Sequence, residues 1–148
     1  MLGLARGGYA DFVQWTRKRY LTYTALNIAQ HVPVQMRVAE IAAEIDAAEL
    51  LARRALKLAR QDYAGMSLET RTLLRRDFTF TVHKLREALD DLVKISGSSG
   101  LMDDNSIQRC WRDAHAISSH VVMNWDVPAE NFGRMEFGLG LNPAYPMF

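Results

Sequence analysis

The sequence predicts an all-α fold, an up-down four-helix bundle with an irregular C-terminal tail. Two long stretches, before and after Gly65, carry apolar residues at alternating spacings of four and three. This spacing is typical of antiparallel packed helices, whereas a half-buried strand would alternate polar and apolar residues. Short glycine-containing segments separate the helical stretches, and short connections between helices favour antiparallel neighbours.

The first long helix is predicted to follow Pro33, a residue well suited to a first helical turn. Its second half is nearly all alanine, so a neighbouring helix can approach closely there. Gly65 is predicted to provide the left-handed cap after residues 63–64. The apolar positions are Val34, Val38, Ile41, Ile45, Ala48, Ala52, Ala55 and Ala59.

The second long helix is predicted to begin after Ser67, which can cap it, with Glu69 in the first turn. It is expected to end at the turn 97–100 and to form an antiparallel hairpin with the helix before it. Its apolar positions are Leu74, Phe78, Thr81, Leu85, Ala88, Leu92 and Ile95.

The flanking segments predict the other two helices and the tail. Residues 2–23 are expected to form the first helix and residues 22–33 a connector. Asp104 or Asn105 can cap a fourth helix that runs to His120, and one short helix is expected after Asp126 and Pro128. The apolar stripe predicted for the fourth helix is Ile107, Trp111, Ala114, Ser118 and Val121.

Composition limits the classes of function. The chain has 148 residues, a formal net charge of +1 and a single cysteine, Cys110. We therefore expect one domain over residues 1–148, with no nucleic-acid partner, no disulfide framework and a reducing, cytoplasmic setting. No apolar run is long enough for a membrane span, and residues 1–12 do not resemble a signal peptide.

His120 is the first candidate site residue. From the residues alone, a surface or interface histidine is the favoured interpretation, and a proton donor or acceptor at a pocket rim is the alternative. Asp113 lies seven residues earlier, about 10 Å away along a helix axis, which disfavours a direct pair. His115 points to another face, so we expect no metal site.

Two further groups of residues allow two interpretations each. The segment Gly97, Ser98, Ser99 and Gly100 can be a helix end and a turn, or its N–H groups can bind a phosphate or a flavin edge. Arg17 and Arg19 can stabilise a helix C-terminus, or they can bind a phosphate.

Taken in order, these residues resemble the C-terminal domain of the acyl-CoA dehydrogenase superfamily. The specific part is the glycine turn GSSG, the capped segment NSIQRCW and the Arg-Asp pair that follows it. The segments LGLARGGYADFV and VQMRVAEIAAEIDAAELL resemble the first and second helices of that domain. The resemblance covers nearly the whole chain.

The residues after Arg-Asp distinguish two branches of the superfamily. Dehydrogenases usually carry Tyr-Glu-Gly-Thr there, and the glutamate takes the α-proton of the substrate. This chain instead has His120-Val121-Val122-Met123, with no carboxylate. In this respect it is similar to two-component flavin-dependent monooxygenases of the p-hydroxyphenylacetate hydroxylase and dibenzothiophene monooxygenase type.

This resemblance implies a homo-oligomer, dimer or tetramer, that takes reduced FMN or FAD from a separate flavin reductase and transfers oxygen to an aromatic substrate. It implies that His120 lies near the reactive edge of the flavin, where it hydrogen-bonds the bound oxygen or helps to deprotonate the substrate. Gly97, Ser98, Ser99 and Gly100 would line a flavin site, often that of a neighbouring subunit. Arg17 or Arg19 would bind the flavin phosphate.

Family enzymes carry an N-terminal helical domain and a middle β-domain before this one. The chain is therefore expected to be a fragment, a truncated product or one piece of a split enzyme, with little or no activity alone. Two alternatives remain open at this stage: a non-catalytic helical assembly module, and part of a dehydrogenase whose base lies elsewhere.

Overall fold

The computed structural model describes residues 1–21, 25–60 and 65–145, and within these ranges the chain is helical with no strand. The helices are α1 (Leu2–Thr16), α2 (Val32–Ala59), α3 (Leu68–Ser96), α4 (Ser106–Ser118) and α5 (Asp126–Glu136). Short 3₁₀ turns lie between them: η1 (Ile28–Gln30), η2 (Gly97–Leu101) and η3 (Val121–Met123). The predicted all-α fold is confirmed, and residues 137–145 form the expected irregular tail.

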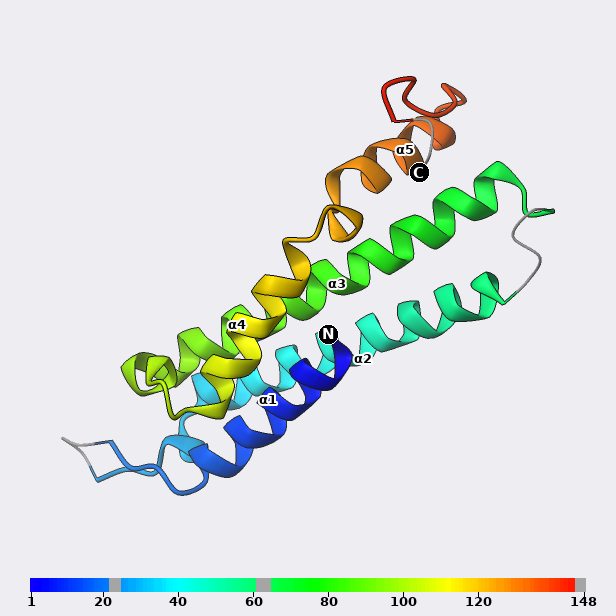
Figure 1. The fold of residues 1–148 in the computed structure, drawn as a ribbon. Coiled ribbons are helices and arrows are strands. Elements are labelled where there is room, and N and C mark those ends of the chain that lie inside the picture. Colours follow the sequence, from blue (N-terminus) through cyan, green and yellow to red (C-terminus); the bar gives the residue numbers. More distant parts are fainter. Residues whose placement is uncertain (22–24, 61–64, 146–148) are drawn as a thin grey trace.

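Figure 1 shows α1 to α4 running up and down beside one another, with α5 continuing past α4 along the first half of α3. The long hairpin of α2 and α3 provides the frame, and α1 and α4 cover one end of it. The largest fully buried apolar side chains are Phe12, Ile41, Leu85, Leu89, Leu92 and Ile107. None of the described helices is long and apolar enough to cross a bilayer.

The predicted contact between the two long helices is largely confirmed. On α2 the buried members of the predicted stripe are Ile41, Ile45, Ala48 and Ala55, and on α3 they are Thr81, Leu85, Ala88 and Leu92. Two positions differ: Ala59 is exposed, and the Phe78 side chain is 38% exposed. Both lie towards the far end of the hairpin, which α1 does not cover, so these residues have fewer neighbours. The predicted end of this helix near Gly65 is wrong: α2 ends at Ala59, and Arg60, with φ at −77°, is its C-cap. Residues 61–64 lie outside the described residues.

A buried carboxylate joins α2 to α3. Asp77 is 1% exposed and accepts hydrogen bonds from Arg54 at 2.6 and 2.9 Å and from Arg76 at 2.8 and 3.1 Å. The bonds to Asp77 raise the pKa of Arg54 above its ordinary value. Two charge-assisted partners offset the cost of removing Asp77 from water, which fixes the register of the hairpin.

A second ionic contact joins α1 to α2. Glu49 accepts hydrogen bonds from Arg53 and from Arg6, and Arg6 comes from α1. The bond from Arg53 contributes most to a pKa of Glu49 below its usual value, and Arg6 adds to the effect. The carboxylate therefore stays ionised and holds the first helix against the second.

The first helix is shorter than predicted, because it ends at Thr16 and not near residue 23. Beyond α1 the chain reverses its direction. The N–H of Leu21 donates to the Leu26 carbonyl at 2.9 Å, and the N–H of Ile28 donates to the Arg19 carbonyl at 3.0 Å. The Asn27 side chain also donates to the Arg17 carbonyl at 3.0 Å. These contacts satisfy the carbonyls that a longer helix would have used, so the turn replaces two helical turns. Tyr23 lies outside the described residues.

The predictions for α3 and α4 differ in outcome. Ser67 accepts from the N–H of Thr70, and Asn105 accepts from the N–H of Ile107, so both caps are confirmed. The predicted extension of α4 to His120 is wrong, and Val121 is 72% exposed. The hydroxyls of Ser118 and Ser119 donate back to the carbonyls of α4 at 3.1 and 2.7 Å, which satisfies carbonyls at its C-terminus.

Candidate functional site

The glycine turn, residues 97–100, follows α3 directly and forms the first four residues of η2. Gly97 ends α3 with φ at +65°, in the left-handed region that favours glycine. Ser98 is exposed, Ser99 is half-buried and Gly100 is buried. A Cβ added at Gly100 would lie 2.3 Å from the Cβ of Ser96, so no other residue fits there without movement.

The close approach at Gly100 leads to a prediction. We expect Gly100→Ala to destabilise the chain by about 1–3 kcal/mol, because the added methyl displaces the last turn of α3. The matched control is Gly7→Ala, since a Cβ at Gly7 meets nothing within 4 Å and lies in the middle of α1. Gly7→Ala should raise the free energy of unfolding by up to about 1 kcal/mol, because alanine has a higher helix propensity than glycine. Thermal unfolding of both variants tests this, and equal melting temperatures would contradict it.

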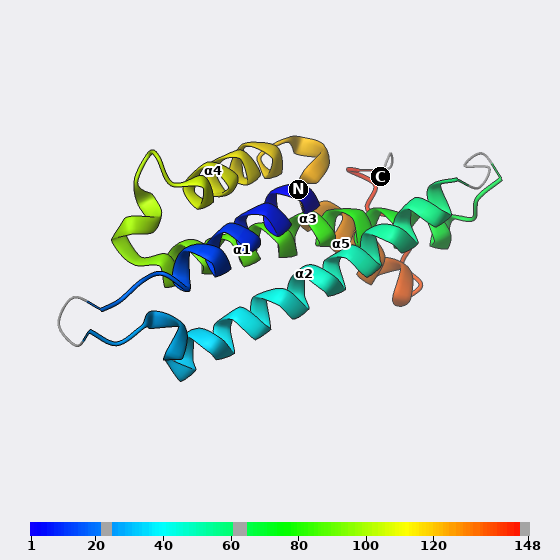
Figure 2. The ribbon, with the colours of Figure 1, turned by 90° about the horizontal axis from the view of Figure 1, so that it is seen from below.

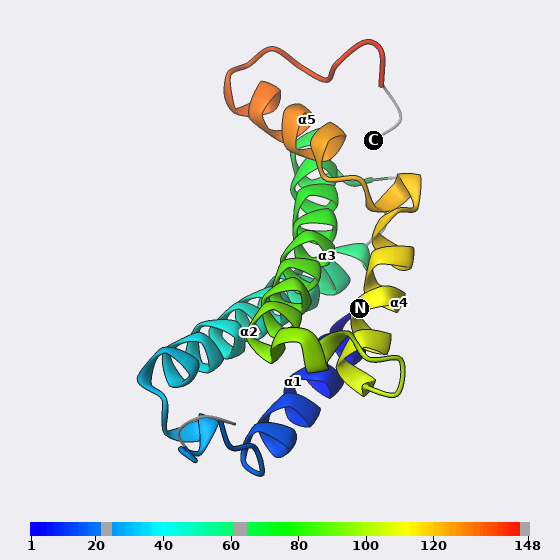
Figure 3. The same cartoon turned by 90° about the vertical axis from the view of Figure 1, so that its left-hand side faces the viewer.

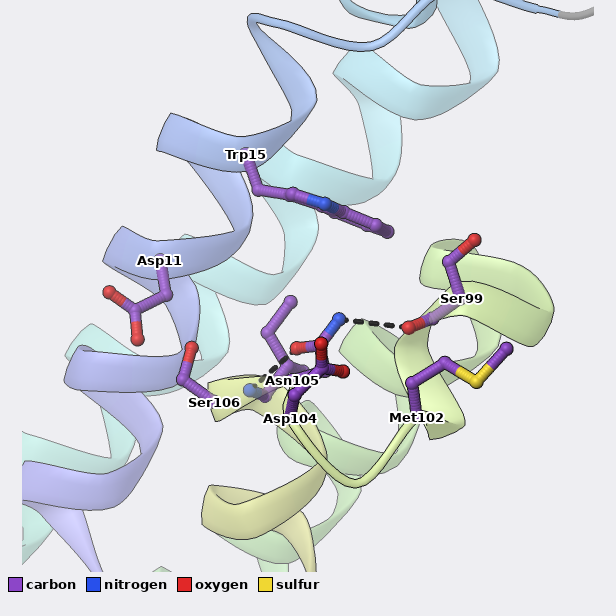
Figure 4. A pocket seen from close by; sticks show the side chains of 8 residues that line it. Asp11, Trp15, Ser99, Met102, Asp104, Asn105 and Ser106 are labelled. Atoms are coloured by element: carbon purple, nitrogen blue, oxygen red, sulfur yellow. Dashed lines mark hydrogen bonds between the residues drawn. The ribbon is translucent and has the colours of Figure 1, made fainter.

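Next to this turn is a hollow of about 390 Å³, lined by residues of α1, η2 and the start of α4. Figure 4 shows the indole of Trp15 forming one wall, with Ser99 and Met102 beside it and Asn105 opposite. Asn105 donates to the Ser99 carbonyl at 2.9 Å and so ties the turn to α4. Asp11 and Asp104 also line the hollow, and their carboxylates can accept hydrogen bonds from hydroxyl groups.

The structure brings Arg19, but not Arg17, to this turn. The Arg19 guanidinium donates to the Ser96 carbonyl at 3.1 Å and to the Ser99 hydroxyl at 3.5 Å, and its Cζ lies 3.9 Å from the centre of the Trp15 ring. Arg17 is exposed and lines a separate hollow of about 140 Å³ between α1 and α2, with Phe12 among its neighbours. Of the two predicted phosphate-binding residues, only Arg19 therefore lies near the glycine turn.

His120 lies at the opposite end of α4, where it caps η3. Its Nδ1 accepts a hydrogen bond from the N–H of Val122 at 3.2 Å. The neutral ring then carries its proton on Nε2, which can donate to a ligand. This bond orients the ring relative to its own backbone.

His120 lines a hollow of about 730 Å³ between the end of α4, the start of α5 and α3. The other residues lining it include Arg75, Asp126, Glu130 and Tyr145. Arg75 donates to the carbonyl of Val122 at 3.2 Å, which holds η3 against α3. Donors and acceptors of both charges thus surround His120, and its own side chain is exposed.

The structure does not bring the two candidate groups together within one copy of the chain. Figure 3 shows η2 and α5 at opposite ends of α4, and α4 has 13 residues, which span about 20 Å. One small ring system therefore cannot touch both the glycine turn and His120 of the same copy. The two hollows would have to serve different ligand groups or different copies of the ligand.

Sequence reasoning missed an aromatic cluster beside His120. The rings of His83 and Trp125 stack at 6.1 Å between centroids, and Phe80 lies 5.1 Å from Trp125. His83, Trp125 and Arg86 line a further hollow of about 250 Å³ that shares Asn124 and Asp126 with the hollow at His120. Phe80 and His83 lie three residues apart on α3, but Trp125 precedes α5 and no local spacing in the sequence connects it to them.

A second missed contact joins α3 to α4. Asp90 lies 2.7 Å from Nε2 of His115 and accepts from the indole N–H of Trp111 at 2.6 Å. Trp111, which was predicted on the apolar stripe of the fourth helix, is thus also tied to α3 by a polar bond. Cys110 is half-buried, and burial raises the pKa of its thiol above its ordinary value. In the described parts of the chain, no group of three potential metal ligands comes together.

The sequence was compared with profiles of known protein families. The profile of the family described as acyl-CoA dehydrogenase, C-terminal domain, matches residues 1–125. The chain belongs to this family. The match includes α1 to α4, the glycine turn and His120, so the resemblance predicted from the turn and the Arg-Asp pair is confirmed.

Among proteins with this domain, the chain is similar to oxygenase components of flavin-dependent hydroxylases. The chain is 37% identical to the oxygenase component of an FADH(2)-dependent resorcinol hydroxylase of Rhizobium sp., over 93% of this chain and 36% of the relative. It is 30% identical to the oxygenase component of p-hydroxyphenylacetate 3-hydroxylase of Acinetobacter baumannii, over 97% of this chain and 35% of the relative.

The fold of the chain is also similar to that of a solved structure that contains reduced flavin. XiaF from Streptomyces sp., in complex with FADH2 and glycerol, superposes with a TM-score of 0.83 at 28% identity, over 96% of this chain and 36% of XiaF. The chain thus spans about a third of the length of the flavin-dependent oxygenases that it resembles.

Proposed function

We propose that this chain is the flavin-binding and oligomerising domain of a reduced-flavin-dependent monooxygenase that hydroxylates an aromatic compound. The observation that carries the proposal is His120: it lines a hollow, its ring is oriented by Val122, and it occurs in a chain whose relatives are oxygenase components of aromatic hydroxylases. A separate cytoplasmic reductase would supply reduced FMN or FAD. Two of the relatives name FADH2, so reduced FAD is the form to test first.

The glycine-turn hollow has groups that suit a flavin. The Trp15 ring offers a flat apolar wall, and Ser99 and Asn105 line the hollow with polar groups. Of the four residues of the glycine turn only Ser99 lines the hollow, and the N–H of Gly97 already donates to the Lys94 carbonyl. The carboxylates of Asp11 and Asp104 would repel a phosphate but can accept from ribityl or ribose hydroxyls. A phosphate would therefore lie on the side of Arg19, away from the two carboxylates.

When bound, reduced flavin would supply the activation of molecular oxygen. The residues of this chain would orient the reacting groups and control a proton. In the tautomer that the bond from Val122 selects, His120 would donate from Nε2 to an oxygen atom near the flavin. Accepting the proton of a substrate hydroxyl at Nε2 would require the other tautomer, with the bond from Val122 broken. Because His120 and the glycine turn lie at opposite ends of α4, the glycine turn would complete the flavin site of a neighbouring subunit.

The chain spans about a third of its relatives, so we expect the rest of the pocket to come from polypeptide outside these 148 residues. An enclosed, water-free site is needed for such chemistry. In this chain, by contrast, His120 is exposed to solvent. We therefore expect little or no hydroxylation by the 148-residue chain alone. Any flavin binding that it shows should be weaker than that of a complete oxygenase.

An anaerobic titration with reduced FAD and reduced FMN, followed by calorimetry, tests the flavin site. We expect saturable binding that Arg19→Ala weakens about tenfold, because the guanidinium both holds the turn and offers a charge to the phosphate. Arg17→Ala is the matched control and should bind as the unchanged chain does. Equal effects of the two substitutions would contradict the assignment to Arg19, and no binding to a folded oligomer would contradict a flavin site in this chain.

A further inference from the structure

The small hollow between α1, η1 and α2 has a mostly apolar lining. Figure 2 shows this end of the bundle, where the connector with η1 leads from the end of α1 to the start of α2. The Gln35 side chain donates to the Ala29 carbonyl at 2.9 Å, which holds η1 against α2. The hollow has a volume of about 140 Å³, and its apolar lining residues are Phe12, Val13, Ala29, Val34 and Val38.

The hollow is also lined by Thr16, a buried polar residue at the end of α1. Thr16 is 5% exposed, and its hydroxyl has no hydrogen-bond partner among the described residues. The other buried threonines of the described helices differ, because the hydroxyls of Thr72, Thr79 and Thr81 donate to carbonyls three or four residues earlier. Leaving a buried hydroxyl unpaired is unfavourable, so the Thr16 hydroxyl indicates a partner that enters the hollow.

The size and the walls of the hollow suit one small ring. Apolar protein cavities of about 150 Å³ bind benzene. In this chain Phe12, which is 1% exposed, forms part of the wall from α1, and Val34 and Val38 form the wall from α2. Packing a ring against these side chains removes apolar surface from water, which is favourable. A single ring that carries one hydrogen-bonding group therefore matches both the volume and the polarity of the hollow.

We propose that this hollow binds a neutral single-ring phenol, with the ring against the apolar walls and the phenolic hydroxyl on the hydroxyl of Thr16. Each hydroxyl can donate and accept, so one hydrogen bond satisfies the group that the chain leaves unpaired. A plain hydrocarbon ring would leave Thr16 without a partner. An aromatic acid would lose the hydration of its carboxylate on entering the apolar hollow. Arg17 also lines the hollow, but its side chain is exposed, so its charge stays hydrated without a ligand.

This phenol site is separate from the sites of the proposed function. The described residues that line it differ from all of those that line the hollow at the glycine turn and the hollow at His120. Binding of a phenol here requires neither flavin nor hydroxylation, and it can be measured on this chain alone. The two proposals can therefore fail independently.

Isothermal titration calorimetry of the 148-residue chain with phenol and with toluene tests the contact to Thr16. Toluene has a methyl group in place of the hydroxyl, and Thr16→Val makes the same exchange in the protein. We expect Thr16→Val to raise the Kd of phenol about tenfold and to leave the Kd of toluene unchanged or lower. Comparing the change for the two ligands cancels their different hydration. Because the hydroxyl has no partner among the described residues, Thr16→Val should retain the melting temperature of the unchanged chain.

A second pair of variants tests the place of binding. Val38→Phe fills the hollow from α2 and should abolish saturable binding of both phenol and toluene. Met36→Phe is the matched control, because it introduces the same side chain on the same helix at a residue that is 66% exposed and lies outside the hollow. It should bind phenol as the unchanged chain does. Circular dichroism checks that both variants fold.

Three results would overturn the proposal. The first is that the folded chain shows no saturable binding of phenol at concentrations that leave its circular dichroism unchanged. The second is an equal change in the Kd of phenol and of toluene in Thr16→Val, since the hydroxyl would then not recognise the ligand. The third is phenol binding that persists in Val38→Phe and is lost in His120→Ala, which would place the phenol in the hollow at His120 and support the proposed function instead.

Discussion

Replacing His120 with alanine is expected to lower the rate of hydroxylation by about 10²–10⁴-fold in an enzyme reconstituted with the N-terminal and middle domains. The rate falls because the variant lacks the imidazole that lines this hollow. In the unchanged chain, the N–H of Val122 donates to Nδ1 of this ring, and Nε2 is left as a hydrogen-bond donor. Flavin binding should change little, because the glycine turn lies at the other end of α4. Product formed per flavin oxidised is the quantity to measure.

His115→Ala is the matched control for this experiment. His115 comes from the same helix and is also partly exposed, but its Nε2 lies 2.7 Å from Asp90. Its loss should weaken the contact between α3 and α4 and lower the melting temperature, with product yield retained below that temperature. Equal losses of product yield for both variants would show that His120 acts through the fold. Full activity of His120→Ala would refute the catalytic role.

Much of the fold could be predicted because the responsible signals are local. Ser67, Asn105 and Gly97 act within one helical turn of their own positions, and all three were placed correctly as helix ends. The stripe of α2 was also predicted well in its middle, at Ile41 and Ile45, since periodic burial is visible in the sequence.

The errors at helix ends have non-local causes. Residues after Thr16 are compatible with a helix, but the chain turns back, and the Arg19 carbonyl accepts a hydrogen bond from the N–H of Ile28 instead. At the end of α4, two serines in succession compete for helix carbonyls, and the start of η3 takes His120 out of the helix. Intrinsic preference cannot decide such cases, because the competing hydrogen bonds depend on residues elsewhere in the chain.

The candidate site was predicted in its parts but not in its arrangement. The sequence singled out Ser99, Arg19 and His120, and the structure joins the first two while placing the third at the far end of α4. The aromatic cluster of His83 and Trp125 was missed, since its members are far apart in the sequence and meet only when α5 packs against α3. Contacts of this kind are set by topology.

The largest expected loss of stability is at Leu89, which is fully buried where α1, α3 and α4 meet. We expect Leu89→Ala to cost about 2–5 kcal/mol, because a buried isobutyl group is cut back to a methyl and the rigid helices close only part of the cavity. Leu50→Ala, at a side chain that is 70% exposed, should change the free energy of unfolding by less than about 0.5 kcal/mol. Urea unfolding of both variants gives the comparison.

The packing at Gly8 sharpens this experiment. A Cβ on Gly8 would lie 3.0 Å from Cδ2 of Leu89 and 3.5 Å from the Cβ of Cys110, so Gly8→Ala is crowded while Leu89 is present. Once Leu89 is replaced by alanine, the added methyl enters vacant space and also gains helix propensity. The double variant should therefore be more stable than the sum of the single effects predicts. Strict additivity would mean that α1 moves away from α3 to relieve the contact, and that the close approach of these two helices is not what confines Leu89.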